Sequence, residues 1–146
     1  MRLHVFVVGK PKLAYARAGV DEYLKRLKAS GGVEITELKS GTREQESAAL
    51  LSRSDGMIRV VLDERGEQVT SREFAAKITA WEHGRAKGVA FLIGGADGHT
   101  EELRRAADWR WALGKITLQH ELALVVLLEQ IYRARSINAG APYHRD

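Results

Sequence analysis

Cysteine is absent from the 146 residues of this chain. Its absence excludes disulfides, thiolate metal sites and cysteine nucleophiles, and it suits a reducing compartment. Long apolar stretches are missing too, because the longest uncharged apolar run covers only residues 122–128, far fewer than the roughly 20 that span a bilayer. The short apolar run at the N-terminus lacks the length and cleavage site of a signal peptide. We therefore expect a cytoplasmic protein without a membrane span.

Several patterns that mark metal or phosphate chemistry are also missing. The five histidines lack a ligand spacing such as H-x-x-x-H, and no carboxylate cluster accompanies them, so we expect no metal site. Neither the P-loop nor the dinucleotide fingerprint occurs. No G-x-S-x-G elbow is present, although a Ser-His-Asp triad stays open.

The length and composition indicate one globular domain over residues 1–146. Hydrophobic residues make up 45% and charged residues 29% of the chain, which is ordinary for a folded domain of this size. The net charge is +4, which permits an RNA partner without requiring one. A solvated surface explains either of the two basic groups alone, whereas their convergence in the fold would favour RNA. The groups are Lys10, Lys12, Arg17, Lys25, Arg26 and Lys28 near the N-terminus, and Arg133, Arg135, His144 and Arg145 near the C-terminus.

Short apolar runs alternate with helical patterns along the whole chain. This alternation predicts an α/β fold with a mostly parallel sheet and helices on both faces. The run at 89–93 is the most continuously apolar and predicts a central strand. Two capping boxes, starting at Thr42 and Thr70, predict helix starts. We expect strands at residues 3–8, 33–38, 57–62, 89–93 and 111–113, and helices at 14–27, about 42–54, about 70–85, about 100–108 and about 121–139.

The last predicted helix is apolar on nearly every side. A surface helix shows one apolar stripe, so a helix of this kind must be covered on most sides. In so short a chain its own sheet would cover one side, and a second copy of the chain would cover another. We therefore expect a homodimer through this helix, the alternative being burial within one protomer.

Three segments are expected at the carboxyl ends of strands, where ligands bind in open α/β sheets. They are residues 62–66, 94–98 and 113–118. The turn Gly94-Gly95-x-x-Gly98 is the strongest local signal, because glycine lets a backbone approach a ligand closely. A tight strand-to-helix turn would explain the same spacing.

The C-terminal tail places Tyr143, His144 and Arg145 in succession. An aromatic ring suits stacking on a base, an imidazole suits proton transfer, and a guanidinium suits phosphate contact. An ordered or frayed terminus without a function is the alternative.

Essentially the whole chain resembles the ribosomal RNA large-subunit methyltransferase H family of the SPOUT superfamily. The residues that carry the resemblance occur in the family's order, and the opening strand and first helix also match. They are Leu92-Ile93-Gly94-Gly95-x-x-Gly98, an Ile-Thr-Leu segment with His120, Glu129-Gln130-Ile131-Tyr132-Arg133-Ala134, and Pro142-Tyr143-His144-Arg145.

The resemblance implies a fold, a cofactor and a reaction. The fold is an α/β knot with a C-terminal trefoil, a rare exception to the rule that chains are unknotted. The cofactor is S-adenosylmethionine, and the reaction is methylation of N3 of a pseudouridine in 23S rRNA, on an assembled ribosomal particle and by a homodimer. The implied cofactor contacts are Leu62, Gly94, Leu113, Gly114, Lys115, Ile116, Thr117 and Leu118.

The resemblance also suggests roles for the polar residues near the C-terminus. His144 is our first choice and His120 our second for the base that removes the N3 proton. Arg133 and Arg145 would position a phosphate or polarise a base carbonyl. Tyr143 would stack on the target base or hydrogen-bond to it.

The chain departs from the family pattern at two positions. Leu124 stands where the family commonly has arginine, and Glu121 replaces the usual glutamine or proline. Any role of that arginine would pass to Arg133 or Arg135.

Two other readings stay open from the residues alone. A non-catalytic factor that binds RNA or the ribosome would share the basic groups and the dimer, but it would not bind the cofactor. A hydrolase or nucleotide-binding enzyme would use the glycine turn for phosphate, but it would need a lysine or a metal-binding hydroxyl close behind. His99 and Thr100 match that requirement poorly.

Overall fold

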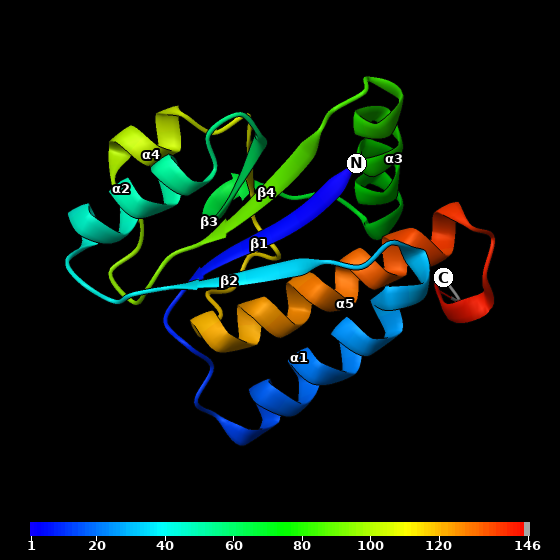
Figure 1. Cartoon of the computed structure of the whole chain (residues 1–146), viewed down its shortest axis with the longest axis horizontal. Helices are drawn as coiled ribbons and strands as arrows, with labels where there is room; N and C mark the ends of the chain where they lie inside the picture. The colour runs from blue at the N-terminus through cyan, green and yellow to red at the C-terminus, as the bar shows by residue number, and fades with distance from the viewer. Residues whose placement is uncertain (145–146) are drawn as a thin grey trace.

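One sheet of five parallel strands forms the centre of the computed structural model, which describes residues 1–144 (Figure 1). The strands are β1 (Arg2–Val8), β2 (Glu34–Leu38), β3 (Ile58–Glu67), β4 (Gly88–Ile93) and β5 (Trp109–Trp111). The helices are α1 (Ala14–Leu27), α2 (Arg43–Arg53), α3 (Ser71–His83), α4 (Glu101–Arg105) and α5 (His120–Asn138), with short 3-10 turns η1 (Lys28–Ser30) and η2 (Pro142–His144). Every pairing is parallel, in the order β2-β1-β4-β3-β5, which confirms the predicted class.

Helices cover both faces of the sheet (Figure 1). The larger apolar core joins one face of the strands to α1, α3 and α5. The smaller core joins the opposite face to α2 and α4 through Leu50 and Leu103. β4 lies at the centre with all six residues buried, as its continuous apolar run predicts, since a central strand of a parallel sheet is covered on both faces.

Both predicted capping boxes are present. The hydroxyl of Thr42 accepts the backbone N–H of Gln45, and the hydroxyl of Thr70 accepts that of Glu73. In each box the third helical side chain returns a bond to the cap residue's N–H. These bonds satisfy backbone donors that the first helical turn leaves open, so α2 and α3 start where the sequence says.

β3 is longer than predicted. The apolar pattern ends at Leu62, but β3 continues to Glu67 and pairs with β5 across a register shift between these two residues. A Cβ on Gly66 would stand 2.6 Å from the backbone of Arg110, so glycine permits the close crossing of the two strands. The sequence does not indicate this extension, because residues 63–65 are polar and the apolar pattern of the strand stops at Leu62.

β5 begins earlier in the sequence than expected, and α4 ends earlier. β5 covers Trp109–Trp111, not residues 111–113, and α4 ends at Arg105, not near residue 108. The carboxylate of Asp108 accepts the backbone N–H of Arg59 in β3, at 2.7 Å. That bond and the bond from the Asp108 N–H to the Arg59 carbonyl draw the chain into the sheet, which ends the helix.

α5 is covered largely within its own chain. It lies between α1 and α3 under the sheet (Figure 1), and Leu124, Leu127, Leu128 and Ile131 are fully buried there. Leu124 therefore occupies a core position in which an arginine would be an unpaired buried charge. The outward stripe of α5 keeps Leu122 and Val126 only half-buried.

Glu121 has a structural role at the start of α1. Its carboxylate accepts the backbone N–H groups of Lys12 and Leu13, at 2.7 and 2.9 Å. These bonds hold the pKa of Glu121 below its ordinary value. Leu13 caps α1 without a side-chain hydrogen bond. Glu121 therefore fixes the chain just before α1, although it does not replace the missing side-chain cap.

Candidate functional site

A cleft of about 410 Å³ opens at the carboxyl ends of β3, β4 and β5. Its volume lies in the range of small-molecule sites. Residues from all three predicted segments border it. Leu62, Gly94, Leu113, Gly114, Ile116, Thr117 and Leu118 line the cleft, whereas the eighth predicted contact, Lys115, does not line it and has an exposed side chain.

The two glycines of the Gly94-Gly95 turn are needed for packing. A Cβ on Gly94 would stand 2.8 Å from Cε1 of His99, and one on Gly95 would stand 2.8 Å from a carboxylate oxygen of Glu46. Only Gly98, at the end of the turn, has a positive φ, of 76°. The turn therefore lies flat against side chains behind the cleft and leaves its backbone facing the cavity.

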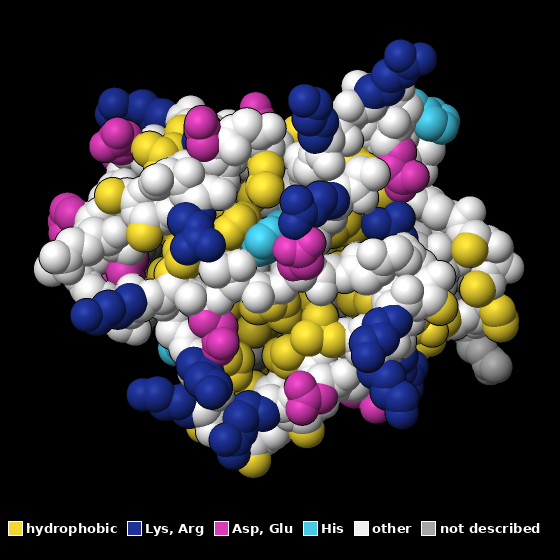
Figure 2. Space-filling model, viewed as in Figure 1, with side chains coloured by type: hydrophobic (Ala, Val, Ile, Leu, Met, Phe, Trp, Pro, Cys, Tyr) yellow, Lys and Arg dark blue, Asp and Glu magenta, His cyan; other side chains and the backbone are white. Residues whose placement is uncertain are grey.

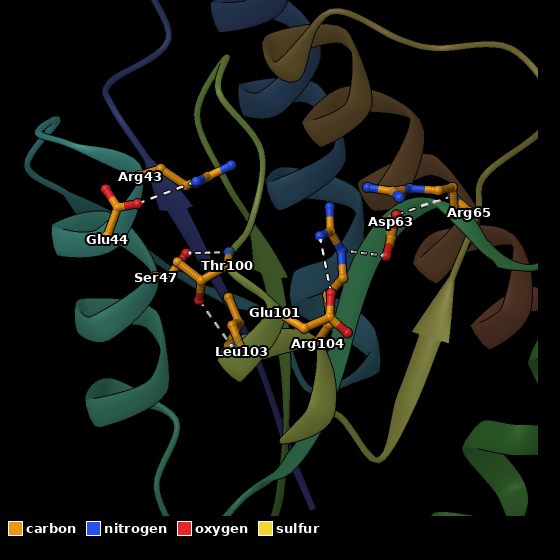
Figure 3. Close-up of polar contacts among 9 residues, drawn as sticks. All are labelled: Arg43, Glu44, Ser47, Asp63, Arg65, Thr100, Glu101, Leu103 and Arg104. Carbon is orange, nitrogen blue, oxygen red and sulfur yellow. Dashed lines mark hydrogen bonds and ion pairs between the residues drawn. The ribbon is translucent and has the colours of Figure 1, made fainter.

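An ion pair stands at one wall of the cleft (Figure 3). Nε of Arg104 lies 3.1 Å from Oδ2 of Asp63, and the other carboxylate oxygen of Asp63 accepts the backbone N–H of Arg65. Burial alone would raise the pKa of Asp63, but these bonds outweigh it and leave the pKa below its ordinary value. The pair ties α4 to the end of β3, and Glu101 lies 3.7 Å from the same guanidinium.

The segment at 113–118 closes over β3. The hydroxyl of Thr117 hydrogen-bonds to the carboxylate of Glu64, and Ile116 is 71% exposed although it borders the cleft. α5 begins directly after this segment, and Gln119 caps its first turn. His120 therefore lies on the cleft, so the second-choice base is within the candidate site.

Arg133 and Tyr143 lie together, but away from this cleft. The phenol of Tyr143 donates to Glu129 at 2.9 Å and lies 3.2 Å from the hydroxyl of Tyr23. Arg133 pairs with Glu129 at 2.7 Å and stands over the Tyr143 ring at 5.0 Å. Burial and these contacts raise the pKa of Tyr143. Glu129 follows His120 by nine residues, about 14 Å along a helix.

The two basic groups of the sequence meet at this aromatic cluster, which consists of Tyr23, Tyr132 and Tyr143. The guanidinium of Arg26 lies 5.6 to 5.9 Å from all three ring centroids. Arg135 belongs elsewhere, 3.6 Å from Glu82 of α3. On the face of the molecule seen in Figure 2, which has the orientation of Figure 1, Lys and Arg side chains are spread around a hollow that contains hydrophobic side chains.

The end of the tail lies outside the described side chains. η2 includes the backbone of His144, but its side chain is not described, and Arg145 lies beyond the described residues. The assignment of His144 and Arg145 to catalysis stays a prediction.

The described residues offer neither a metal site nor a membrane span. Within residues 1–144, no three His, Asp or Glu side chains are grouped so that they could hold a metal ion. None of the helices described is long and apolar enough to cross a membrane.

Comparison with known proteins gives the family. A family model described as a predicted SPOUT methyltransferase matches residues 1–144. This chain belongs to the SPOUT methyltransferase family. It is 48% identical to a ribosomal RNA large subunit methyltransferase H from Deinococcus deserti, with 99% of this chain and 100% of the relative covered. It is 47% identical to one from Thermus thermophilus, with 99% of each covered.

Solved structures agree with the SPOUT assignment at the level of the fold. A probable methylase family protein from Haemophilus influenzae superposes with a TM-score of 0.59 at 13% identity, covering 95% of this chain and 67% of that one. At that identity the likeness concerns the fold alone. The trefoil knot that the SPOUT family implies stays an expectation for this chain.

Sequence reasoning missed three polar residues that line the cleft of this SPOUT chain, His99, Asp63 and Arg104. The predicted segment 62–66 contains Asp63, but no role is predicted for it, and His99 lies just after the segment 94–98. A histidine directly after a glycine turn was the available signal for His99. Arg104 gave no signal, because one arginine on a short helix looks like any solvated charge.

Proposed function

We propose that this SPOUT methyltransferase transfers a methyl group from S-adenosylmethionine to N3 of a pseudouridine in 23S rRNA. The observation that carries the proposal is the match over the whole chain to relatives named ribosomal RNA large subunit methyltransferase H. The base and the atom come from the family that the motifs resemble. We further propose that residues 1–146 form one catalytic domain that works in the cytoplasm, where ribosomes are found.

The cleft suits S-adenosylmethionine. Its walls are apolar at Leu62, Ile93, Leu113 and Leu118, and its floor is the backbone of a glycine turn. Apolar walls with a few backbone polar groups suit a purine ring and a sulfur-containing chain. The open space at Gly114, where a Cβ would meet nothing within 4 Å, leaves that side free for the ligand. The residues present therefore fit the cofactor.

The bound cofactor supplies an electrophilic methyl group on a sulfonium, and the chain supplies alignment and proton removal. Leu62, Leu113, Leu118 and the backbone of the Gly94 turn would hold the cofactor, whose methyl would pass to N3 and whose sulfur would become a neutral thioether. The N3–H of the imide is weakly acidic, so a neutral imidazole can take its proton. His144 is the proposed base and His120, at the cleft, the alternative. Arg133 and Arg145 would hold RNA phosphate or polarise a carbonyl.

We propose that the chain works as a homodimer whose tails each serve the partner's cleft. Glu129, which holds Tyr143 by a hydrogen bond, lies about 14 Å beyond His120 along α5, and Arg133 lies about 20 Å beyond it. A tail in this position leaves its own cleft unserved. The half-buried Leu122 and Val126 form an apolar stripe on the outside of α5, and Ile116 and Leu13 are exposed at 71% and 42%. A contiguous apolar patch marks an association surface, and we propose that these four side chains belong to one.

We expect Leu122→Asp to convert the dimer to a monomer. The substitution would place a charge in the middle of the apolar stripe, where it would be desolvated without a partner. Light scattering coupled to gel filtration should give twice the 16.2 kDa chain mass for the wild type and the single mass for the variant. Ala76→Asp, on the exposed side of α3, is the matched control and should stay dimeric. A dimeric Leu122→Asp variant would contradict the interface.

The test of the function is methyl transfer to ribosomes that lack the modification. We would offer 70S particles, separate subunits and free 23S rRNA with S-adenosylmethionine labelled in its methyl group. We expect label in 23S rRNA from assembled particles and little in free rRNA. A methyl on N3 blocks Watson–Crick pairing, so reverse transcription should stop one nucleotide before the modified base.

A non-catalytic factor for RNA or the ribosome is the competing function. It would bind particles without incorporating label, and calorimetry would detect no binding of S-adenosylmethionine. That pair of results would overturn the enzyme proposal.

A further inference from the structure

The side chain of His99 touches two of the three segments that border the cleft. Its imidazole is 5% exposed, and Nε2 lies 2.9 Å from the carbonyl oxygen of Leu62. On the other side, Cε1 and Nδ1 would stand only 2.8 and 2.9 Å from a Cβ on Gly94. The ring therefore packs against the glycine turn while it is hydrogen-bonded to Leu62 in the middle of β3.

The hydrogen bond fixes where the proton of His99 lies. A carbonyl oxygen can only accept, so Nε2 must donate. Nδ1 is buried and has no hydrogen-bond partner among the described residues, so it is the unprotonated nitrogen of a neutral ring. Burial lowers the pKa of His99 and outweighs the Leu62 carbonyl and Asp63, which raise it.

The sheet itself does not hold these two segments together. The last paired residues of β3 and β4 are Val61 and Leu92. Beyond that pair no ladder bond joins the strands, and Leu62 and Gly94 face the cleft between the diverging ends. The bond from His99 takes the place of the ladder at the point where the cleft opens.

We propose that His99 is a positioning residue that holds the carbonyl of Leu62 against the Gly94 turn and so sets the width of the cofactor cleft. The inference rests on the proposed function, because the cleft is taken as the site of S-adenosylmethionine. His99 acts through its hydrogen bond to the backbone of Leu62 and through its packing against Gly94, which has no side chain. Because the width of the cleft is fixed before binding, none of the binding free energy is lost in ordering the cleft.

The experiment compares two amides at position 99. In His99→Gln the amide nitrogen can take the place of Nε2 and donate to Leu62. In His99→Asn the amide nitrogen stands near the place of Nδ1 and cannot reach. Both side chains are uncharged, smaller than histidine and able to donate. Only the reach of the donor differs between them.

We expect S-adenosylmethionine to bind His99→Gln within about threefold of the wild type and His99→Asn about tenfold more weakly, the size of one neutral hydrogen bond. Calorimetry would measure both. At saturating cofactor kcat should be the same for both variants, so the defect lies in KM. Hydrogen exchange should be faster at residues 62–66 and 94–98 in His99→Asn alone. Should His99→Asn not fold, His99→Phe keeps a ring without a donor and should show the same weak binding.

Two results separate this inference from the proposed function. A wild-type chain that does not bind S-adenosylmethionine overturns both. A wild-type chain that binds it, with His99→Gln and His99→Asn equally tight or equally weak, overturns only the positioning role of His99.

Discussion

Replacement of His144 by alanine is expected to lower kcat for methyl transfer by about 10²- to 10⁴-fold, the usual contribution of a general base. The N3 proton must leave as the methyl arrives, and His144 directly follows Tyr143 in the sequence. Tyr143 is anchored by Glu129 and Tyr23, which holds the backbone of η2 in place. Cofactor affinity should not change, because the residues proposed to hold the cofactor are those that line the cleft, such as Leu62, Gly94 and Leu118, and His144 is assigned only to proton removal.

His120→Ala tests the alternative base with the same measurement. His120 borders the cleft, so its loss should weaken cofactor binding while kcat falls by less than about tenfold, as for a residue that assists binding only. His83→Ala, at the exposed end of α3, controls for the loss of a histidine as such. A wild-type kcat in His144→Ala, together with a large loss in His120→Ala, would reverse the assignment.

Gly94→Ala is expected to remove most of the cofactor affinity. The added Cβ would lie 2.8 and 2.9 Å from two ring atoms of His99, which is itself packed and bonded to Leu62. The turn must then move into the cleft, or His99 must release the carbonyl. Overpacking of this kind costs about 1–3 kcal/mol of stability. We expect a Kd for S-adenosylmethionine raised by about 10- to 100-fold, because the displaced turn occupies the ligand's space.

The chain offers a matched control for Gly94→Ala. Gly114 also lines the cleft, but a Cβ there would meet nothing within 4 Å. Gly114→Ala should therefore leave the melting temperature unchanged. Shortening His99 to serine should make the added methyl of Gly94→Ala tolerable, so the two substitutions together should cost less stability than the sum of each alone. Additive losses would show that the contact between the two residues is not the cause.

The fold could be predicted where local rules agree with the tertiary structure. The capping boxes at Thr42 and Thr70 and the apolar run of β4 specify their elements directly, because a few neighbouring residues decide each one. The extension of β3 to Glu67 could not be predicted, since it depends on a partner strand more than forty residues away. The end of α4 likewise depends on the bonds between Asp108 and Arg59.

The candidate site divides in the same way. The rule that ligands bind at the carboxyl ends of parallel strands led to the segments of Leu62, Gly94 and Leu113 before the structure was known. It said nothing of side chains that reach the cleft from behind, such as His99. The sequence motifs also did not predict that Arg133 lies beside Tyr143. That contact arises because the turn after α5 folds the tail back onto Glu129. These placements depend on side-chain contacts between distant elements.

The strand order has a consequence for how the chain is made. β1 lies next to β4, and α5, the last helix, fills the space between α1 and α3. β1 can therefore pair with β4 only after more than eighty further residues have been synthesised. The hydrogen bonds from Lys12 and Leu13 likewise form only when Glu121 is present. Such distant pairings make folding slow and leave apolar strands unsheltered in the meantime. Nearly all of the chain must emerge from the translating ribosome before its main core can close, because that core includes α5.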